Sequence, residues 1–248
     1  MRKIFKDDDL DTQLKSEGYV LIQEFFDDNR LSELRKVFEG VEQWDGRSFF
    51  TTQWLEDKKQ KSAIHNELKL KLSNRLRELL VSYRDIFSYF MIKKSKDESF
   101  SHVHQDWTLV DEEKFVGLNI WGPLVDVDEH NGALGVLPKS HLKYTQVRGT
   151  DIPQSFDPVE LKNTETLLNI KMKAGDILFF DHRLVHASSN NSSDTTRASV
   201  GTVLIPDEAD LLHYYMDINK ITKMRVDDNF LLKHSFGENI RKYAAQTV

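Results

Sequence analysis

The sequence of 248 residues contains no cysteine. Without thiols the chain can form no disulfide framework, no zinc ribbon, no iron–sulfur cluster and no thiol nucleophile. Any bound metal must therefore be held by histidine, carboxylate or water. Long linkers rich in proline, glycine and serine are also missing, so we predict a single domain.

The sequence also lacks an excess of positive charge and long apolar runs. Lys and Arg number 34 against 40 Asp and Glu, a formal net charge of −6, which argues against nucleic acid as the main partner. No stretch approaches the ~20 apolar residues that span a bilayer, and the N-terminal MRKIFKDDDL lacks the apolar part of a secretion signal. We expect a cytoplasmic protein without nucleic-acid or membrane partners. The oligomeric state is not readable from these features.

What is present favours a β-rich core. Hydrophobic residues make up 39% of the chain, enough for a sizeable core. Short runs rich in Val, Ile, Phe, Tyr and Trp are separated by turn signals such as Asn131-Gly132 and Gly175-Asp176. The predicted strands are 87–94, 101–107, 115–122, 132–137, 167–172, 176–181, 184–188 and 197–205. This pattern predicts a β-sandwich or jelly roll with flanking helices.

The flanking segments differ in texture from this core. Residues 18–22 form a short apolar run typical of a strand, and apolar residues at three/four spacing predict helices over about 27–38 and 62–80. The last forty residues are expected to be partly helical. We therefore divide the domain 1–248 into an N-terminal strand and helices (1–82), a jelly-roll core (83–206) and a C-terminal extension (207–248).

Two His-x-acid triplets occur, at His65 and His104, and about 1.4 are expected by chance for this composition. Side chains two residues apart on a helix diverge, so His65 is expected on a solvated helix face. In contrast, His104 and Asp106 fall in a predicted strand, where residues two apart share a face. This second triplet can present two metal ligands side by side.

A third ligand is expected from His186, at the end of the apolar strand in DILFFDHRLVHASS. Two histidines and one carboxylate on one face of an octahedron leave three positions open, as in non-haem Fe(II) oxygenases. His182 lies four residues earlier, a spacing that places two ligands together on a helix. The surrounding run is β-like, so we expect His182 to point outward.

Arg197 follows His186 by eleven residues, after the polar segment SSNNSSDTT, and opens the apolar run RASVGTVLIP. We expect a hairpin across this segment, which would return Arg197 to the side of His186. A guanidinium matches a carboxylate with two parallel hydrogen bonds. Arg197 is therefore a natural partner for the distal carboxylate of 2-oxoglutarate.

From about Gln13 to Ile205 the chain resembles the phytanoyl-CoA dioxygenase family of Fe(II)/2-oxoglutarate oxygenases. The resemblance rests on GYVLIQEFFDDNRLSELR, the HQD triplet, NIWGPLVDVDEHNGALGVLPKSH and AGDILFFDHRLVHASSNNSSDTTRAS. One departure is Lys139, which stands where the family has glycine before Ser140-His141. It affects a turn and no ligand.

The resemblance implies a double-stranded β-helix (cupin-like jelly roll) and hydroxylation of an unactivated C–H bond, with release of succinate and CO2. It assigns Fe(II) to His104, Asp106 and His186, with 2-oxoglutarate and O2 as co-substrates. Contacts to 2-oxoglutarate would come from Arg197, Ser188 and Trp121. Related halogenases have Ala or Gly at the position of Asp106, so a carboxylate there favours hydroxylation.

The substrate is expected to be a small molecule. An amino acid or biosynthetic intermediate is favoured over an acyl-CoA, because no basic cluster is evident for the phosphates of coenzyme A. The residues expected to line its pocket are His102, Trp107, Trp54, Tyr144 and Arg148. Two alternatives stay open: a zinc or manganese cupin-type hydrolase or isomerase with the same ligands, and a non-catalytic jelly-roll binding protein.

Overall fold

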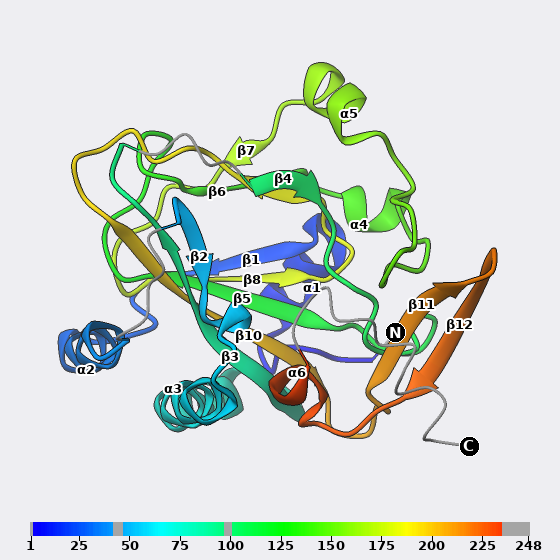
Figure 1. The fold of residues 1–248 in the computed structure, drawn as a ribbon, viewed down its shortest axis with the longest axis horizontal. Coiled ribbons are helices and arrows are strands. Elements are labelled where there is room, and N and C mark those ends of the chain that lie inside the picture. The colour runs from blue at the N-terminus through cyan, green and yellow to red at the C-terminus, as the bar shows by residue number, and fades with distance from the viewer. Residues whose placement is uncertain (1, 42–46, 97–100, 235–248) are drawn as a thin grey trace.

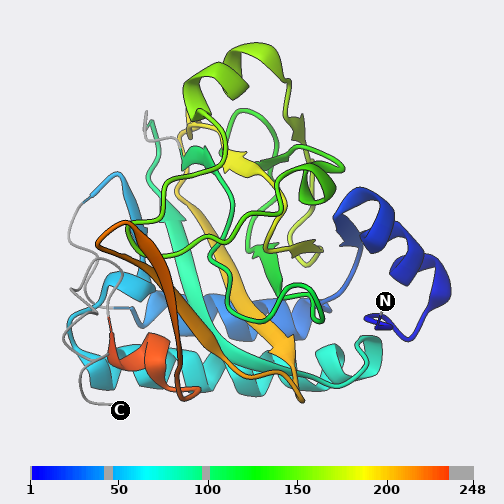
Figure 2. The ribbon, with the colours of Figure 1, turned by 90° about the vertical axis from the view of Figure 1, so that its right-hand side faces the viewer.

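Two antiparallel sheets face each other in the centre of the molecule (Figures 1 and 2). The computed structural model describes residues 2–41, 47–96 and 101–234. The major sheet has the order β1 (Tyr19–Ile22), β8 (Ile177–Asp181), β5 (Leu118–Pro123), β10 (Arg197–Pro206), β3 (Tyr83–Lys93) and β2 (Phe49–Thr51). The minor sheet has the order β4 (Ser101–His104), β9 (His186–Ser188), β6 (Leu134–Val136) and β7 (Leu168–Asn169). The predicted jelly-roll class is confirmed.

The longest helices cover the outer face of the major sheet, and one short helix packs on the minor sheet. The helices are α1 (Asp8–Glu17), α2 (Asp28–Glu39), α3 (Lys58–Leu79), α4 (Ser140–Lys143), α5 (Pro158–Thr164) and α6 (Phe230–Lys233), with a 3-10 turn η1 (Thr52–Trp54). Asp27 and Asp57 begin α2 and α3, since their carboxylates accept hydrogen bonds from free N–H groups of the first turn. In the described ranges no helix combines the length and the apolarity that crossing a membrane requires.

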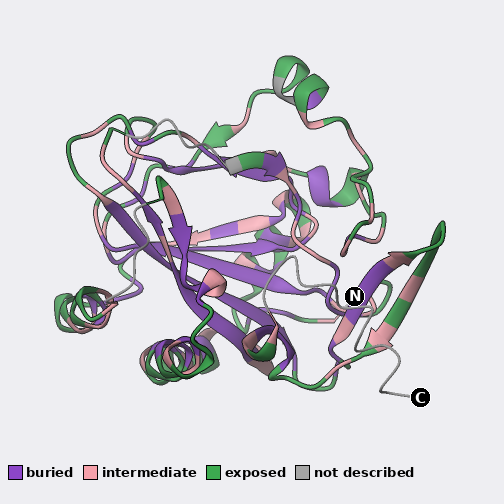
Figure 3. Ribbon diagram, viewed as in Figure 1, coloured by how far each residue is buried: buried purple, intermediate pink, exposed green. Residues whose placement is uncertain are grey.

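The alternation of side chains along each strand separates the core into two layers. On β8, Ile177 and Phe179 pack toward the helices, whereas Leu178 and Phe180 pack toward the minor sheet. In Figure 3 the strands of the major sheet are buried along most of their length, whereas α2 and α3 expose their outer faces. The face toward the minor sheet is the one available for a site.

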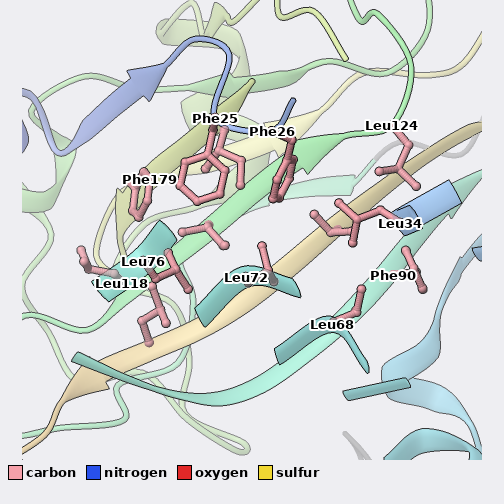
Figure 4. Close-up of a cluster of buried hydrophobic side chains, with 14 of the residues drawn as sticks. Phe25, Phe26, Leu34, Leu68, Leu72, Leu76, Phe90, Leu118, Leu124 and Phe179 are labelled. Carbon is pink, nitrogen blue, oxygen red and sulfur yellow. The ribbon is translucent and has the colours of Figure 1, made fainter. Parts of the chain in front are cut away.

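The helix layer is held by leucines of α3. Leu68, Leu72 and Leu76 lie against the strands, in one cluster with Phe90 and Phe179 (Figure 4). Leu68 and Leu72 are fully buried, and their spacing of four residues places them on one face of the helix. This contact fixes α3 on β3, the strand that pairs with β10 and β2.

An observed strand overlaps each of the eight predicted between 83 and 206. Two strands of the major sheet, β1 and β2, come from the segment before residue 83. Of the C-terminal segment, expected to be partly helical, α6 is a helix, whereas β11 (Leu212–Asp217) and β12 (Lys220–Arg225) form a hairpin that was not predicted. Its turn uses Ile218 and Asn219 with positive φ angles, without the glycine that marks such turns in a sequence. Residues 235–248 lie outside the described part.

His65 is buried, contrary to the solvated helix face expected from the sequence. Its Nδ1 accepts a hydrogen bond of 3.0 Å from the backbone N–H of Ser88, and its ring stacks on Phe87. Both partners belong to β3. The difference arises because His65 lies on the face of α3 that packs on this strand.

Two leucines of α3 provide a test of this packing. Leu72 is completely buried and Leu70 is 70% exposed. We expect Leu72→Ala to lower the free energy of unfolding by about 2–5 kcal/mol, because it leaves a cavity under the sheet. The control Leu70→Ala should change it by less than about 0.5 kcal/mol. Urea unfolding followed by circular dichroism measures both, and equal effects would contradict the packing.

Candidate metal centre and co-substrate site

The structure brings His104, Asp106 and His186 together. His104 ends β4 and lies opposite His186, the first residue of β9, in the register of the minor sheet. The candidate ligand atoms of the three residues all lie within 4.8 Å of one another. The distance between His186 Nε2 and Asp106 Oδ2 is 3.8 Å, and the imidazole centroids are 4.3 Å apart. One ion could contact all three side chains.

Both imidazoles are oriented by the backbone. Nδ1 of His104 lies 2.6 Å from the carbonyl oxygen of His102, and Nδ1 of His186 lies 2.9 Å from that of Leu184. A carbonyl only accepts, so Nδ1 carries the proton in each neutral ring and Nε2 keeps its lone pair for a metal. Burial lowers the pKa of His104 to about 4, which keeps this ring neutral at pH 7.

Asp106 lies two residues beyond the end of β4, so the predicted strand 101–107 is too long. Because Asp106 is not part of a strand, three hydrogen bonds outside the sheets fix its position. Its backbone N–H donates to the carbonyl of His182 at 3.0 Å, its carbonyl accepts from Nε of Arg148 at 2.9 Å, and Nδ2 of Asn119 donates to Oδ2 at 2.6 Å. Burial alone would raise the pKa of Asp106, but the nearby imidazoles and the Asn119 hydrogen bond lower it overall.

These donors fit a divalent transition metal. Two neutral imidazole nitrogens and one ionised carboxylate are the ligand set of the facial Fe(II) triad. The second contact on each ligand, a carbonyl or an amide, is the kind of outer support that fixes ligand orientation. The residues present therefore fit a metal with further coordination positions left open.

The triad lines a cavity of about 370 Å³, to which both sheets contribute side chains. Arg197 lies in the same cavity, but it does not reach it by the expected hairpin. It begins β10 of the major sheet, opposite Lys93 of β3, whereas His186 belongs to the minor sheet. The segment between them crosses from one sheet to the other. Asn191 in that segment is fully buried and donates to the carbonyls of Lys93 and Thr195, so the segment is more than a solvated turn.

Arg197 is a buried cation whose hydrogen-bonding capacity is largely unused. Its side chain is among the largest that are fully buried. Nη1 donates to Oγ of Ser199 at 2.8 Å, Nε has no hydrogen-bond partner, and the guanidinium lies 5.4 Å from the centroid of the Trp121 ring. Within the described ranges no carboxylate forms an ion pair with Arg197. Burial lowers its pKa to about 9, which leaves the group protonated at pH 7. A ligand carboxylate would supply the missing partner.

The other predicted site residues divide into two groups. Ser188, Trp121, Trp54 and Trp107 all line the cavity. Ser188 and Trp121 are buried, and Trp54 and Trp107 are half-buried. These four residues thus surround the same cavity as the triad.

Three predicted pocket residues do not line this cavity. His102 is exposed, because residues two apart do not share a face across the irregular pairing of β4 and β9. Tyr144 packs on Phe156 with ring centroids 5.0 Å apart. Arg148 forms a buried ion pair of 2.7 Å with Glu112. Its Nε also donates to the backbone carbonyl of Asp106, so it supports the position of a candidate metal-binding residue.

His182, expected to point outward, is fully buried and lines the cavity. It follows the last residue of β8, and its backbone N–H donates to the carbonyl of Gly117. A Cβ at position 117 would collide with Nδ1 of His182, so glycine makes room for the ring. Sequence reasoning also missed Asn119 and Tyr89 as cavity residues. Their alternate positions in β5 and β3 were the signal that could have placed them on the cavity face of the sheet.

The contact between Asn119 and Asp106 can be tested directly. We expect Asn119→Ala to weaken Co(II) binding by about 10- to 100-fold, because the carboxylate loses the donor that orients it. Thr202→Val is the matched control, since it removes a buried hydrogen bond to Ser88 in the neighbouring strand and touches no ligand. Anaerobic calorimetric titration measures both affinities. An unchanged affinity in Asn119→Ala would show that the amide does not support the ligand.

Comparison with solved structures gives the same fold in several enzymes of low sequence identity. The carbocyclase SnoK from nogalamycin biosynthesis is 21% identical, with a TM-score of 0.57 over 83% of this chain and 86% of that one. The epimerase SnoN, in complex with Fe3+, alpha-ketoglutarate and nogalamycin RO, is 22% identical, with a TM-score of 0.58 over 82% and 84%. HygX from Streptomyces hygroscopicus, with nickel, 2-oxoglutarate and hygromycin B bound, is 14% identical, with a TM-score of 0.60 over 82% and 88%.

Comparison with curated proteins gives no match. The sequence profile of the phytanoyl-CoA dioxygenase (PhyH) family, in contrast, matches residues 14–199, three quarters of the chain. This range includes the whole triad and Arg197. The predicted family and its cofactors, iron and 2-oxoglutarate, are thereby confirmed. The chain belongs to the phytanoyl-CoA dioxygenase family, within the Fe(II)/2-oxoglutarate-dependent oxygenases.

Proposed function

We propose that the protein is a dioxygenase that hydroxylates an unactivated C–H bond of a small molecule, with Fe(II) as cofactor and 2-oxoglutarate and O2 as co-substrates. One observation carries the proposal: a buried arginine that has no acidic partner among the described residues lines the same cavity as an oriented His-Asp-His triad. Similar solved structures that contain Fe3+ or nickel together with 2-oxoglutarate support it.

When bound, the metal supplies a centre at which O2 and 2-oxoglutarate react together, to give succinate, CO2 and an oxidised substrate. The balance is simple: one oxygen atom of O2 enters succinate and the other enters the C–H bond as a hydroxyl group. No external reductant is needed, because decarboxylation of 2-oxoglutarate supplies two electrons.

The residues of the chain bind the metal, orient the co-substrate and exclude water. His104, Asp106 and His186 hold the metal, and Arg197 receives the distal carboxylate of 2-oxoglutarate, with Trp121 and Ser188 beside it. The guanidinium gains a counter-charge in a low-dielectric site, where charge-assisted hydrogen bonds are strong. The apolar walls keep water away from the reacting groups.

Hydroxylation is proposed over halogenation because the carboxylate of Asp106 occupies the position that a halogenase leaves free for chloride. Similar structures include an epimerase and a carbocyclase, so the fold alone does not select the outcome. The substrate is a small molecule in this proposal, as are nogalamycin RO and hygromycin B in the complexes of SnoN and HygX. Incorporation of one 18O atom from 18O2 into the product, read by mass spectrometry, distinguishes hydroxylation from these alternatives.

The role of Arg197 gives the test of the proposed function. We expect Arg197→Ala to raise the Kd for 2-oxoglutarate by about 10- to 100-fold, the value of a charge-assisted hydrogen-bonded pair. The exposed Arg225, paired with Asp210, provides the control Arg225→Ala, which should change nothing. Anaerobic titration of the Fe(II) protein, followed by the visible charge-transfer band of its 2-oxoglutarate complex, measures both.

Two results would overturn the proposal. The first is the absence of a charge-transfer band when Fe(II) and 2-oxoglutarate are both present, since the co-substrate would then not chelate the metal. The second is turnover that depends on zinc and proceeds without O2, which would indicate a hydrolase.

A further inference from the structure

The cavity walls are mainly aromatic and aliphatic. Among the described lining residues are six aromatic side chains: Phe49, Trp54, Tyr89, Trp107, Trp121 and Phe180. Phe49 and Trp54 meet edge to face, with centroids 5.6 Å apart, and Trp107 meets His213 in the same way at 5.4 Å. Such walls favour flat rings, which can stack on one aromatic face and meet the edge of another.

The wall contains few charged side chains, and each already has a partner in the proposed function. Of the described lining residues, Asp106 is the acidic one and Arg197 the one that is Lys or Arg, and the histidines are His104 and His186 of the triad and the fully buried His182. Asp106 faces the metal, and Arg197 faces the distal carboxylate of the co-substrate. With Fe(II) and doubly charged 2-oxoglutarate bound, the charges of the site cancel. A charged substrate group beside the metal would therefore be buried without a counter-charge, which is unfavourable.

The polar groups left for a substrate are uncharged. Gln53, Thr51 and Tyr89 line the cavity, as does His182, whose two ring nitrogens have no hydrogen-bond partner in the described part of the chain. Burial raises the pKa of Tyr89 far above its ordinary value, so the phenol stays neutral. A Cβ at Gly201 would collide with the Tyr89 ring, which therefore rests directly against β10. Amide and hydroxyl groups of this kind suit a hydroxyl or carbonyl group on the ligand.

A cation does occur near the cavity, but at its rim. Arg47 is exposed, and its guanidinium lies 5.6 Å from the centroid of Trp54. Trp54 itself is half-buried, so the contact lies where the cavity meets solvent. Any charged part of a substrate is thus restricted to the outside of Trp54.

We infer that the part of the substrate presented to the metal is an uncharged, ring-containing and largely apolar group with at most a hydroxyl or carbonyl as polar anchor. This inference rests on the proposed function and names the substrate class of the same site. It replaces the amino acid favoured by the sequence, because an α-ammonium and an α-carboxylate would need two counter-charges that the described wall lacks. A cyclic biosynthetic intermediate agrees with it.

A set of indoles with one skeleton and different charges tests the inference. Tryptophol is neutral, indole-3-acetate is an anion, tryptamine is a cation and L-tryptophan is a zwitterion. Each is titrated by calorimetry into the anaerobic complex of the protein with Fe(II) and 2-oxoglutarate, and 1-hexanol serves as a neutral probe without a ring. We expect tryptophol to bind at least tenfold more tightly than each of the other four.

Two variants locate the binding site. Trp54→Ala should weaken tryptophol binding at least tenfold and leave the charge-transfer band of the Fe(II)–2-oxoglutarate complex unchanged, since Trp54 belongs to the substrate side. Gln53→Glu should raise the affinity for tryptamine at least tenfold, because it places a counter-charge in the wall. Gln13→Glu adds the same charge on an exposed face of α1 and should alter neither affinity.

The outcomes separate the two proposals. Loss of the charge-transfer band in the wild-type protein contradicts the proposed function, whatever the indoles do. With the band present, the inference is overturned if a charged indole or 1-hexanol binds as tightly as tryptophol, if tryptophol does not bind, or if Gln53→Glu leaves the affinity for tryptamine unchanged.

Discussion

The site depends on one unfavourable burial, that of the Arg197 guanidinium. This protonated arginine is almost fully buried and contacts the Ser199 hydroxyl and the Trp121 ring. Among the described residues it lacks the acidic partner that buried charges require. The chain keeps this charge inside because β10 belongs to the centre of the major sheet, between β3 and β5. An anionic ligand in the cavity relieves the cost. The position of Arg197 is therefore the basis for proposing that a carboxylate binds at this end of the cavity.

The two sheets divide the remaining work. The minor sheet carries His104 and His186 opposite each other, with their tautomers set by backbone carbonyls, and the major sheet supplies Asn119 and Arg197. Because each strand alternates its side chains between two faces, the same strands bury leucines and phenylalanines against α3 and present functional groups to the cavity. A substitution that shifts α3 would thus also shift these strands and the functional groups that they carry.

Much of this arrangement was predictable from the sequence, for identifiable reasons. The triad could be found because ligand spacing and residue type are local, and every predicted strand of the core has a counterpart. Arg197 was predicted in the right cavity, but the hairpin expected between His186 and Arg197 was wrong. The segment between them connects two different sheets, and which strands pair over such a distance cannot be read from local sequence. His182 and His102 were misplaced because strand alternation stops at the end of β8 and is broken where β4 pairs irregularly with β9. The β11–β12 hairpin lacked a glycine turn signal.

The central claim is that the metal and the distal carboxylate of 2-oxoglutarate are held by the two groups of side chains that share this cavity. The most direct measurement is a crystal structure of the protein prepared anaerobically with Fe(II) and 2-oxoglutarate. We expect the metal to be bound by Nε2 of His104, a carboxylate oxygen of Asp106 and Nε2 of His186, with the distal carboxylate on the Arg197 guanidinium. A metal bound elsewhere, or a distal carboxylate out of contact with Arg197, would contradict it.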